Sequence, residues 1–154
     1  MSMSSEYLAG YFDADGCVIA TLRHNKYLSS RAAVVGNNRE LLGYLKETFG
    51  GNVYKMHGKA RLEKAHMWVA AGRAALPFLL FIQRHVVLKK DRVSLCVEIA
   101  ESLQQSTRVV PEDVLRHRYI SGLSVCLLNQ VDKTNPRETK TIARLRRLIG
   151  CISG

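Results

Sequence analysis

The stretch Leu8-Ala9-Gly10-Tyr11-Phe12-Asp13-Ala14-Asp15-Gly16 decides how this chain folds. A serine ahead of it can cap a helix, and the apolar residues between Glu6 and Asp13 recur at the spacing of one helix face. Asp15-Gly16 is typical of a helix stop. The alternating, β-branched run from Cys17 to Leu22 then predicts a strand. The stretch therefore predicts the end of a helix that leads directly into a strand.

Acidic residues gather in this opening segment. The first sixteen residues contain Glu6, Asp13 and Asp15 and no Lys or Arg, in a chain whose 23 Lys+Arg and 13 Asp+Glu give a net charge of +10. A hard divalent cation binds carboxylate oxygens and water and can bridge them to phosphate, so this acidic island is a candidate cation site. One acid at the helix end can point into the scaffold while the other projects beyond it. An ordinary helix-stop turn is the competing interpretation, and the acids alone would favour it.

Length and composition limit the class of protein. The 154 residues suit one domain, 1–154, and can bury a core without disulfides or metal. With 47% hydrophobic and 23% charged residues, disordered, collagen-like and coiled-coil chains are excluded. The longest uncharged apolar run, Ala74 to Ile82, is too short for a membrane span, and we expect no membrane partner. The basic excess favours a polyanion, most often nucleic acid and less often an anionic membrane.

The cysteines carry information on the compartment. Cys17, Cys96, Cys126 and Cys151 form no CxxC pair, and each has apolar neighbours, which is typical of reduced thiols in a core. The first residues show no signal-peptide pattern. We therefore expect an intracellular reducing compartment, and the choice among compartments, organelles included, stays open.

Outward from the opening stretch, strands and helices follow in pairs. Strands are expected at 17–22, 31–35, 52–57 and 65–71, and helices at 6–13, 39–49, 76–82, 93–103, 111–128 and 142–149. The order is helix, two strands, helix, two strands and then helices. It predicts an α+β domain without linkers or low-complexity segments.

The opening stretch resembles the LAGLIDADG motif of homing endonucleases. Seven of its nine positions match by identity, and Tyr11 and Phe12 keep the apolar character of the other two. Val35-Gly36-Asn37 and Phe49-Gly50-Gly51 look like the start of the family's second helix and the turn after it, and Leu88-Lys89-Lys90 looks like the segment with its active-site lysine. The resemblance implies an αββαββα core with a DNA-binding antiparallel sheet and additional C-terminal helices.

Only one copy of the motif is present. The nearest second candidate, Ile120 to Leu128, has no acid. The resemblance therefore implies a homodimer in which two motif helices touch, because Ala9 and Gly10 have almost no side chain, and in which both copies of Asp15 meet. The residues expected at this interface are Leu8, Ala9, Gly10, Phe12 and Asp13.

The resemblance also implies roles for individual residues. Asp15 and the backbone carbonyl of Ala14 would bind Mg²⁺, or another divalent cation such as Mn²⁺, between the scissile phosphates. Lys89 would stabilise charge and hold the attacking water, with Lys90 and Arg92 as neighbours able to share or take its role. Asn37 would orient water, and Asn38 is an alternative one residue on. Asp13 is more often structural than a ligand.

A β-ribbon fits the major groove of DNA, and strand alternation then predicts which side chains face it. In the third strand, Lys55 and His57 share a face. In the fourth strand, Lys64, His66 and Trp68 share a face, and Ala65, Met67 and Val69 are expected to point toward the core. Val35 looks like core, so that Arg31, of the same parity, is expected at a strand edge. The expected DNA contacts are Thr21, Arg23, Asn25, Lys26, Tyr27, Arg31, Lys55, His57, Lys64, His66, Trp68, Lys133, Arg137 and Lys140.

These features favour a homodimeric, magnesium-dependent endonuclease that cleaves both strands of a long, near-palindromic DNA site and leaves 3′ overhangs. Two alternatives remain on the same scaffold: an RNA maturase, whose partner would be intron RNA, and a catalytically silent DNA-binding regulator. A pure binder does not need Asp15, so the intact acids favour cleavage.

Overall fold

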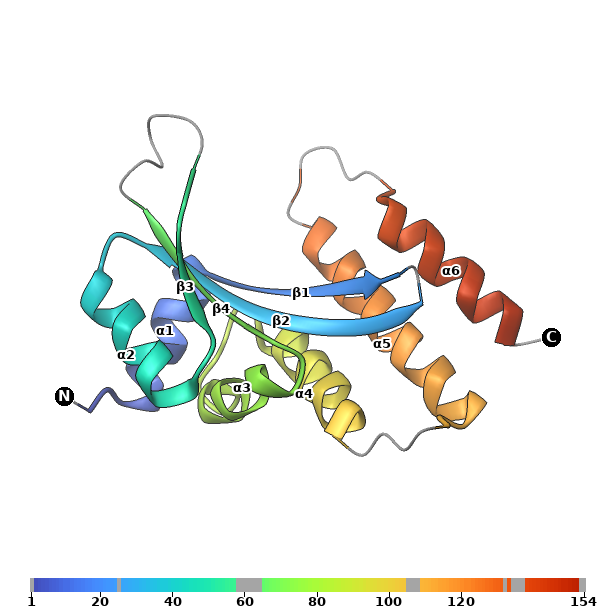
Figure 1. The fold of residues 1–154 in the computed structure, drawn as a ribbon, viewed down its shortest axis with the longest axis horizontal. Helices are drawn as coiled ribbons and strands as arrows, with labels where there is room; N and C mark the ends of the chain where they lie inside the picture. The colour runs from blue at the N-terminus through green and yellow to red at the C-terminus, as the bar shows by residue number, and fades with distance from the viewer. Residues whose placement is uncertain are drawn as a thin grey trace.

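A computed structural model of the chain describes residues 2–24, 26–57, 65–104, 109–131, 133 and 138–152. Its elements follow the predicted order (Figure 1). They are α1 (Ser5–Asp15), β1 (Gly16–Arg23), β2 (Tyr27–Gly36), α2 (Arg39–Phe49), β3 (Asn52–Lys55), β4 (His66–Ala71), the 3₁₀ turn η2 (Gly72–Ala75), α3 (Leu76–Ile82), α4 (Lys90–Gln104), α5 (Glu112–Val131) and α6 (Lys140–Ile152). The α+β class and the α-ββ-α-ββ core with added C-terminal helices are confirmed. Among the described residues, no helix combines the length and the apolar character needed to cross a bilayer.

Helix α1 leads without a loop into the first strand. The Ser4 hydroxyl oxygen caps its start by accepting from the backbone N–H of Tyr7 at 3.2 Å. At its end, a Cβ on Gly16 would lie 2.2 Å from the ring of Phe12, so only glycine lets β1 start this close to the helix. Leu8 and Phe12 are buried in the core. The motif therefore fixes both the helix and its junction with the sheet.

The four strands form one antiparallel sheet in the order β1-β2-β4-β3. Val18 and Ala20 are buried on one face of β1, and the hydroxyl of Ser30 on β2 donates to the Cys96 carbonyl of α4 at 3.5 Å. This face is the one that the helices cover. Figure 1 shows the helices below and beside the sheet, with no described helix over the opposite face. We call that opposite face the open face.

The predicted parity of β4 is wrong. Trp68 is fully buried on the helix side, where its Nε1 donates to the Gly50 carbonyl at 2.9 Å and its ring lies 4.9 Å from that of Phe78. Met67 and Val69 take the open face instead, and both are half-buried. A strand with apolar residues on both faces gives no clear alternation, so tertiary packing decided the parity.

Val35 and Arg31 of β2 both lie on the open face, alternate with the helix-side residues Ala32 and Val34, and are half-buried. The expectation that Val35 is core is therefore wrong. Arg31 pairs with Ile19 on β1 and with Ala71 on β4, so it stands in the middle of the sheet and not at an edge.

Helix α5 covers the free edge of β1. The Asn129 side-chain amide donates to the Val18 carbonyl at 2.8 Å, and the Cys126 thiol lies 3.7 Å from the Ala20 carbonyl. An edge strand exposes unpaired backbone groups, so these bonds protect it from other pairings. Helix α6 packs on α5 through Ile142 and Leu145, and it leaves Cys151 exposed, contrary to the prediction that every cysteine lies in the core.

Candidate active site and nucleic-acid interface

The carboxylate of Asp13 joins the end of α1 to the segment that leads into α4. Its Oδ2 accepts from the backbone N–H groups of Val87 (2.7 Å) and Leu88 (3.1 Å), and its Oδ1 accepts from that of Lys89 (3.0 Å). These donors belong to the three residues just before α4, and a negative charge is favoured near the N-terminus of a helix. Asp13 is therefore a structural acid, and its carboxylate is engaged within its own chain.

The side chain of Lys89 also contacts the end of α1. Its Nζ donates to the carbonyl oxygens of Phe12 (2.9 Å) and Asp13, and the ring of Phe12 lies 5.9 Å from Nζ. Burial lowers the pKa of Lys89 below that of an ordinary lysine; Asp13 and Asp15 oppose that shift and Arg92 adds to it. A cation at a helix C-terminus also interacts favourably with the last carbonyls.

Asp15 projects from the same helix end and is exposed, as is Ala14. Burial raises the pKa of Tyr11, and the charge of Asp15 adds to that shift. Oxygen donors of this kind suit Mg²⁺ or Mn²⁺. Among the described residues, no three His, Cys, Asp or Glu side chains gather into a metal cluster. The Asp15 carboxylate and the Ala14 carbonyl fit a divalent cation in kind.

The two asparagines after β2 have different environments. The Asn38 side-chain oxygen caps α2 by accepting from the Leu41 N–H at 3.1 Å, so this amide is already committed. Asn37 is exposed one residue earlier. Tyr11 from α1 packs here, because its hydroxyl oxygen lies 2.5 Å from where a Cβ on Gly36 would be. Sequence reasoning missed Tyr11, whose apolar spacing alone marked it as core.

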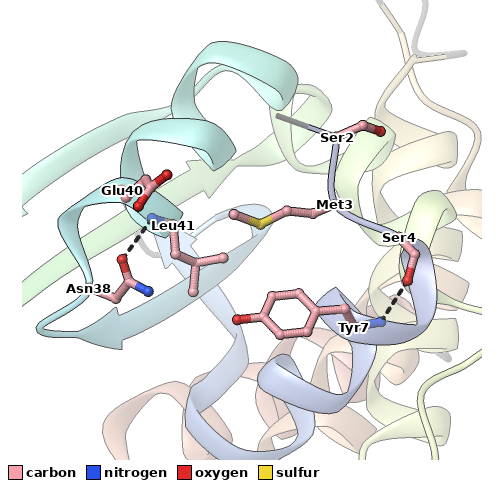
Figure 2. Close-up of a pocket in the computed structure, with 7 residues that line it drawn as sticks. All are labelled: Ser2, Met3, Ser4, Tyr7, Asn38, Glu40 and Leu41. Carbon is pink, nitrogen blue, oxygen red and sulfur yellow. Dashed lines mark hydrogen bonds between the residues drawn. The ribbon is translucent and has the colours of Figure 1, made fainter.

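A hollow of about 320 Å³ lies between the N-terminal segment, α1 and α2. Figure 2 shows the Tyr7 ring along this hollow, directed from α1 toward Asn38 on the α2 side. The Tyr7 side chain is 52% exposed. This hollow borders the exposed side of α1.

The exposed side of α1 differs from the predicted interface. Leu8, Ala9 and Phe12 are buried against the chain's own sheet and helices, so they are not available to a second copy. Gly10 is the one predicted interface residue that is exposed, and a Cβ on it would meet nothing within 4 Å. The side chain of Tyr7 and that of Ala14 share its exposure. Apolar and small residues lie on more than one side of this helix, so its sequence alone does not show which side packs against the core.

The predicted DNA contacts divide between the two faces of the sheet. Thr21, Arg23 and Arg31 lie on the open face. Lys55 and His66 pair with each other on the parity of Trp68, which faces the helices. Lys55 and His66 therefore do not share the open face with Thr21, Arg23 and Arg31. Trp68 is completely buried, which contradicts its prediction as a groove-facing residue.

The remaining predicted contacts that the structure describes lie at the β1–β2 turn, after β3 and around the start of α6. Lys26 and Tyr27 are exposed at the β1–β2 turn, with the Lys26 ammonium 5.5 Å from the centre of the Tyr27 ring. His57 is exposed just after β3, and Lys133 and Lys140 are exposed between α5 and the first turn of α6. Asn25, Lys64 and Arg137 lie outside the described residues.

Comparison with known proteins identifies the fold. No family model matches the sequence, and no curated protein matches it either. Solved structures do: the homing endonuclease I-CvuI in complex with its target (TM-score 0.71, 19% identity, 97% of this chain and 94% of that one), the archaeal intron-encoded homing endonuclease I-Vdi141I with DNA (0.72, 17%, 97% and 94%) and the homing endonuclease I-TnaI (0.63, 18%, 99% and 99%).

The chain thus has the fold of LAGLIDADG homing endonucleases over nearly its whole length. It corresponds in size to one complete I-CvuI or I-Vdi141I chain. The match to the LAGLIDADG homing endonuclease I-SmaMI includes 96% of this chain but only 49% of the I-SmaMI chain (TM-score 0.63, 15% identity). The single-motif architecture is consistent with these proportions.

Proposed function

We propose that the protein is a homodimeric, divalent-metal-dependent, site-specific DNA endonuclease. The observation that carries this proposal is the arrangement at the end of α1. The Lys89 ammonium donates to the Phe12 and Asp13 carbonyls in the last turn of α1, the turn that ends at exposed Asp15 and leads into β1. A cation and an acid beside a phosphodiester are the groups that phosphoryl hydrolysis needs.

Each residue has a distinct task in this proposal. The Asp15 carboxylate and the Ala14 carbonyl of two copies would hold Mg²⁺ or Mn²⁺, which supplies charge neutralisation at the phosphate and acidifies a bound water. Lys89 stabilises negative charge on the phosphate and orients the attacking water. Exposed Asn37 orients water from the α2 side. Asp13 sets the position of Lys89 without touching the substrate.

The dimer would be built on the exposed side of α1. Gly10 leaves room for a second helix at close range, and Tyr7 and Ala14 lie on the same side. Val87 and Leu88 are 75% and 77% exposed and are tied to α1 through Asp13. An apolar surface beside a small-residue helix face suits an isologous contact, which would bring the two copies of Asp15 together.

Charge supports DNA as the substrate. The net charge is +10, and Arg23, Lys26, Lys133 and Lys140 are exposed and would contact phosphates. The structures of I-CvuI and I-Vdi141I, which have this fold, contain bound DNA and so support this choice.

The test is selection from a randomised duplex library with magnesium. The proposal predicts enrichment of cleaved molecules that share one near-palindromic site. Selection of a bound site that is never cleaved would point instead to a DNA-binding regulator. Binding of structured intron RNA with rescue of splicing, and no duplex cleavage, would point to a maturase.

A further inference from the structure

The open face of the sheet is ordered in rows by its strand register. Each row is written in the strand order β1, β2, β4, β3, and only the second row includes all four strands. The rows, beginning at the end nearest Asp15, are Val35–Met67–Tyr54, Cys17–Ala33–Val69–Asn52, Ile19–Arg31–Ala71, Thr21–Ser29 and Arg23–Tyr27. We call the first two rows the inner rows and the last two the outer rows.

The inner rows are apolar where the sheet is broadest. Val35, Met67, Cys17 and Val69 are half-buried and Ala33 is buried by its neighbours, and the polar groups of these rows stand only on β3, at Tyr54 and Asn52. The outer rows present hydroxyl, guanidinium and phenol groups. Hydrogen bonds to base edges can therefore come from the outer rows, whereas in the inner rows only the two β3 residues offer polar groups.

The inner rows also lie beside the candidate catalytic groups. Lys89 is hydrogen-bonded to the end of α1, which leads directly into Gly16 and the inner-row residue Cys17, and Arg31 pairs with Ile19 in the adjacent row. Along the chain, Cys17 is two residues after Asp15, and Val35 is two residues before Asn37. DNA whose phosphates reach Asp15 and Lys89 therefore passes over the inner rows.

Positive charge frames this apolar patch. Arg31 stands in the row next to it, and its buried Nε has no hydrogen-bond partner among the described residues. Arg23 lies two rows farther out. A polyanion is favoured over an uncharged apolar partner at such a surface.

We propose that the inner rows read thymine through its 5-methyl group in the major groove. This inference rests on the proposed function and specifies which bases the site takes. The thymine methyl is the apolar group that the major groove displays, and aliphatic side chains contact it. We therefore expect A·T pairs at the positions of each half-site nearest the cleavage point, with hydrogen-bonded readout farther out. Val69 and Met67 are the specificity-determining residues of these inner positions.

The test measures binding separately from cleavage. A bound site is first selected from a randomised duplex library in metal-free buffer. Each thymine is then replaced singly by deoxyuridine, which lacks the methyl group, and affinity is measured by fluorescence anisotropy. Burial of one methyl is worth about 0.8 kcal/mol, so each inner-position replacement should weaken binding about fourfold, whereas outer replacements should change it less than about twofold.

Two variants and one control locate the effect in the chain. Val69→Ala and Met67→Ala shorten the apolar surface and should bring the thymine and deoxyuridine duplexes to within about twofold of each other. Ser29→Ala, in an outer row, should keep the inner thymine preference. Thermal unfolding of each variant verifies that the sheet is intact.

Several results would overturn the inference. Specific binding with no thymine preference at the inner positions, or equal affinity for thymine and deoxyuridine duplexes with the wild type, would mean that the inner rows do not read the methyl group, while the proposed nuclease function would stand. A preference that survives both Val69→Ala and Met67→Ala would assign it to other residues. Failure to bind any duplex would overturn the proposed function as well.

Discussion

Asp13 and Lys89 are joined twice. The Asp13 carboxylate accepts from the backbone N–H of Lys89 at 3.0 Å, and the Lys89 ammonium donates to the backbone carbonyl oxygen of Asp13. Each residue thus binds the backbone of the other with its side chain. Since Asp15 is only two residues from Asp13, this reciprocal contact fixes the position of the Lys89 ammonium relative to Asp15, the candidate metal ligand.

Loss of the Asp13 carboxylate should cost stability. Asp13→Ala leaves three backbone N–H groups without their acceptor, and we expect the free energy of unfolding to fall by about 2 kcal/mol. Asp13→Asn keeps one acceptor oxygen and should lose less. Urea unfolding measures both. A wild-type midpoint for Asp13→Ala would show that the contact contributes nothing to the fold.

The pH dependence of cleavage should report on Lys89. If the ammonium is the working form, the cleavage rate falls as pH rises through the pKa of Lys89. Because burial lowers that pKa, the fall should occur below 10.5, where an ordinary lysine titrates. A guanidinium stays charged over this range, so any activity retained by Lys89→Arg should lack this limb. If the cleavage rate of Lys89→Arg falls at the same pH as that of the wild type, Lys89 is not the cause of the fall.

The same shift has a consequence for folding. A lysine whose pKa is lowered in the folded state binds fewer protons than in the unfolded chain over the interval up to 10.5, so stability rises with pH across that interval. Lys89→Met removes this titration. The variant should therefore show a flatter dependence of unfolding free energy on alkaline pH than the wild type.

The fluorescence of Trp68 should not respond to DNA binding. Trp68 is the sole tryptophan, is fully buried and donates to the Gly50 carbonyl. Its fluorescence should be blue-shifted, resist acrylamide and stay unchanged when duplex is added. Trp68→Phe leaves that carbonyl without its donor and should cost about 1–2 kcal/mol of stability. Quenching by bound duplex would contradict the burial and restore the groove-facing role predicted from sequence.

A substitution at Gly10 should affect folding and dimerisation in opposite directions. An exposed helix glycine is less favourable than other residues by up to about 1 kcal/mol, so Gly10→Gln should stabilise the monomer while it obstructs close helix contact. Sedimentation should show a dimer for the wild type and a monomer for Gly10→Gln, with Gly43→Gln, on the exterior of α2, as the matched control. A wild-type monomer that cleaves both strands would contradict the dimer.

Local signals were enough for much of this fold. The small residues of the motif, the Gly16 junction and the alternation of β1 are encoded within a few residues, and the predicted order of elements is confirmed. The parity of β4 was not so encoded, because Trp68 and Val69 are both apolar and the packing of Phe78 decides between them. The buried side of α1 depended in the same way on distant elements.

The candidate site was predictable to a similar degree. Resemblance singled out Asp15 and Lys89, whereas the link between them runs through Asp13 and backbone groups 74 to 76 residues away. No local pattern encodes a contact of that range. The open face likewise needed the register between strands before its inner and outer rows could be distinguished.

The most direct test of the account compares Asp15→Asn with Asp113→Asn, a charge-matched change at an exposed acid on α5. Cleavage of the selected duplex with magnesium, and binding of the same duplex, are measured for both. We predict that Asp15→Asn binds but cleaves more than about a hundredfold more slowly, which exceeds the effect of a residue that only supports a metal ligand, while Asp113→Asn cleaves like the wild type. Wild-type cleavage by Asp15→Asn would contradict the assignment of Asp15 as the essential ligand and, with it, the proposed active site.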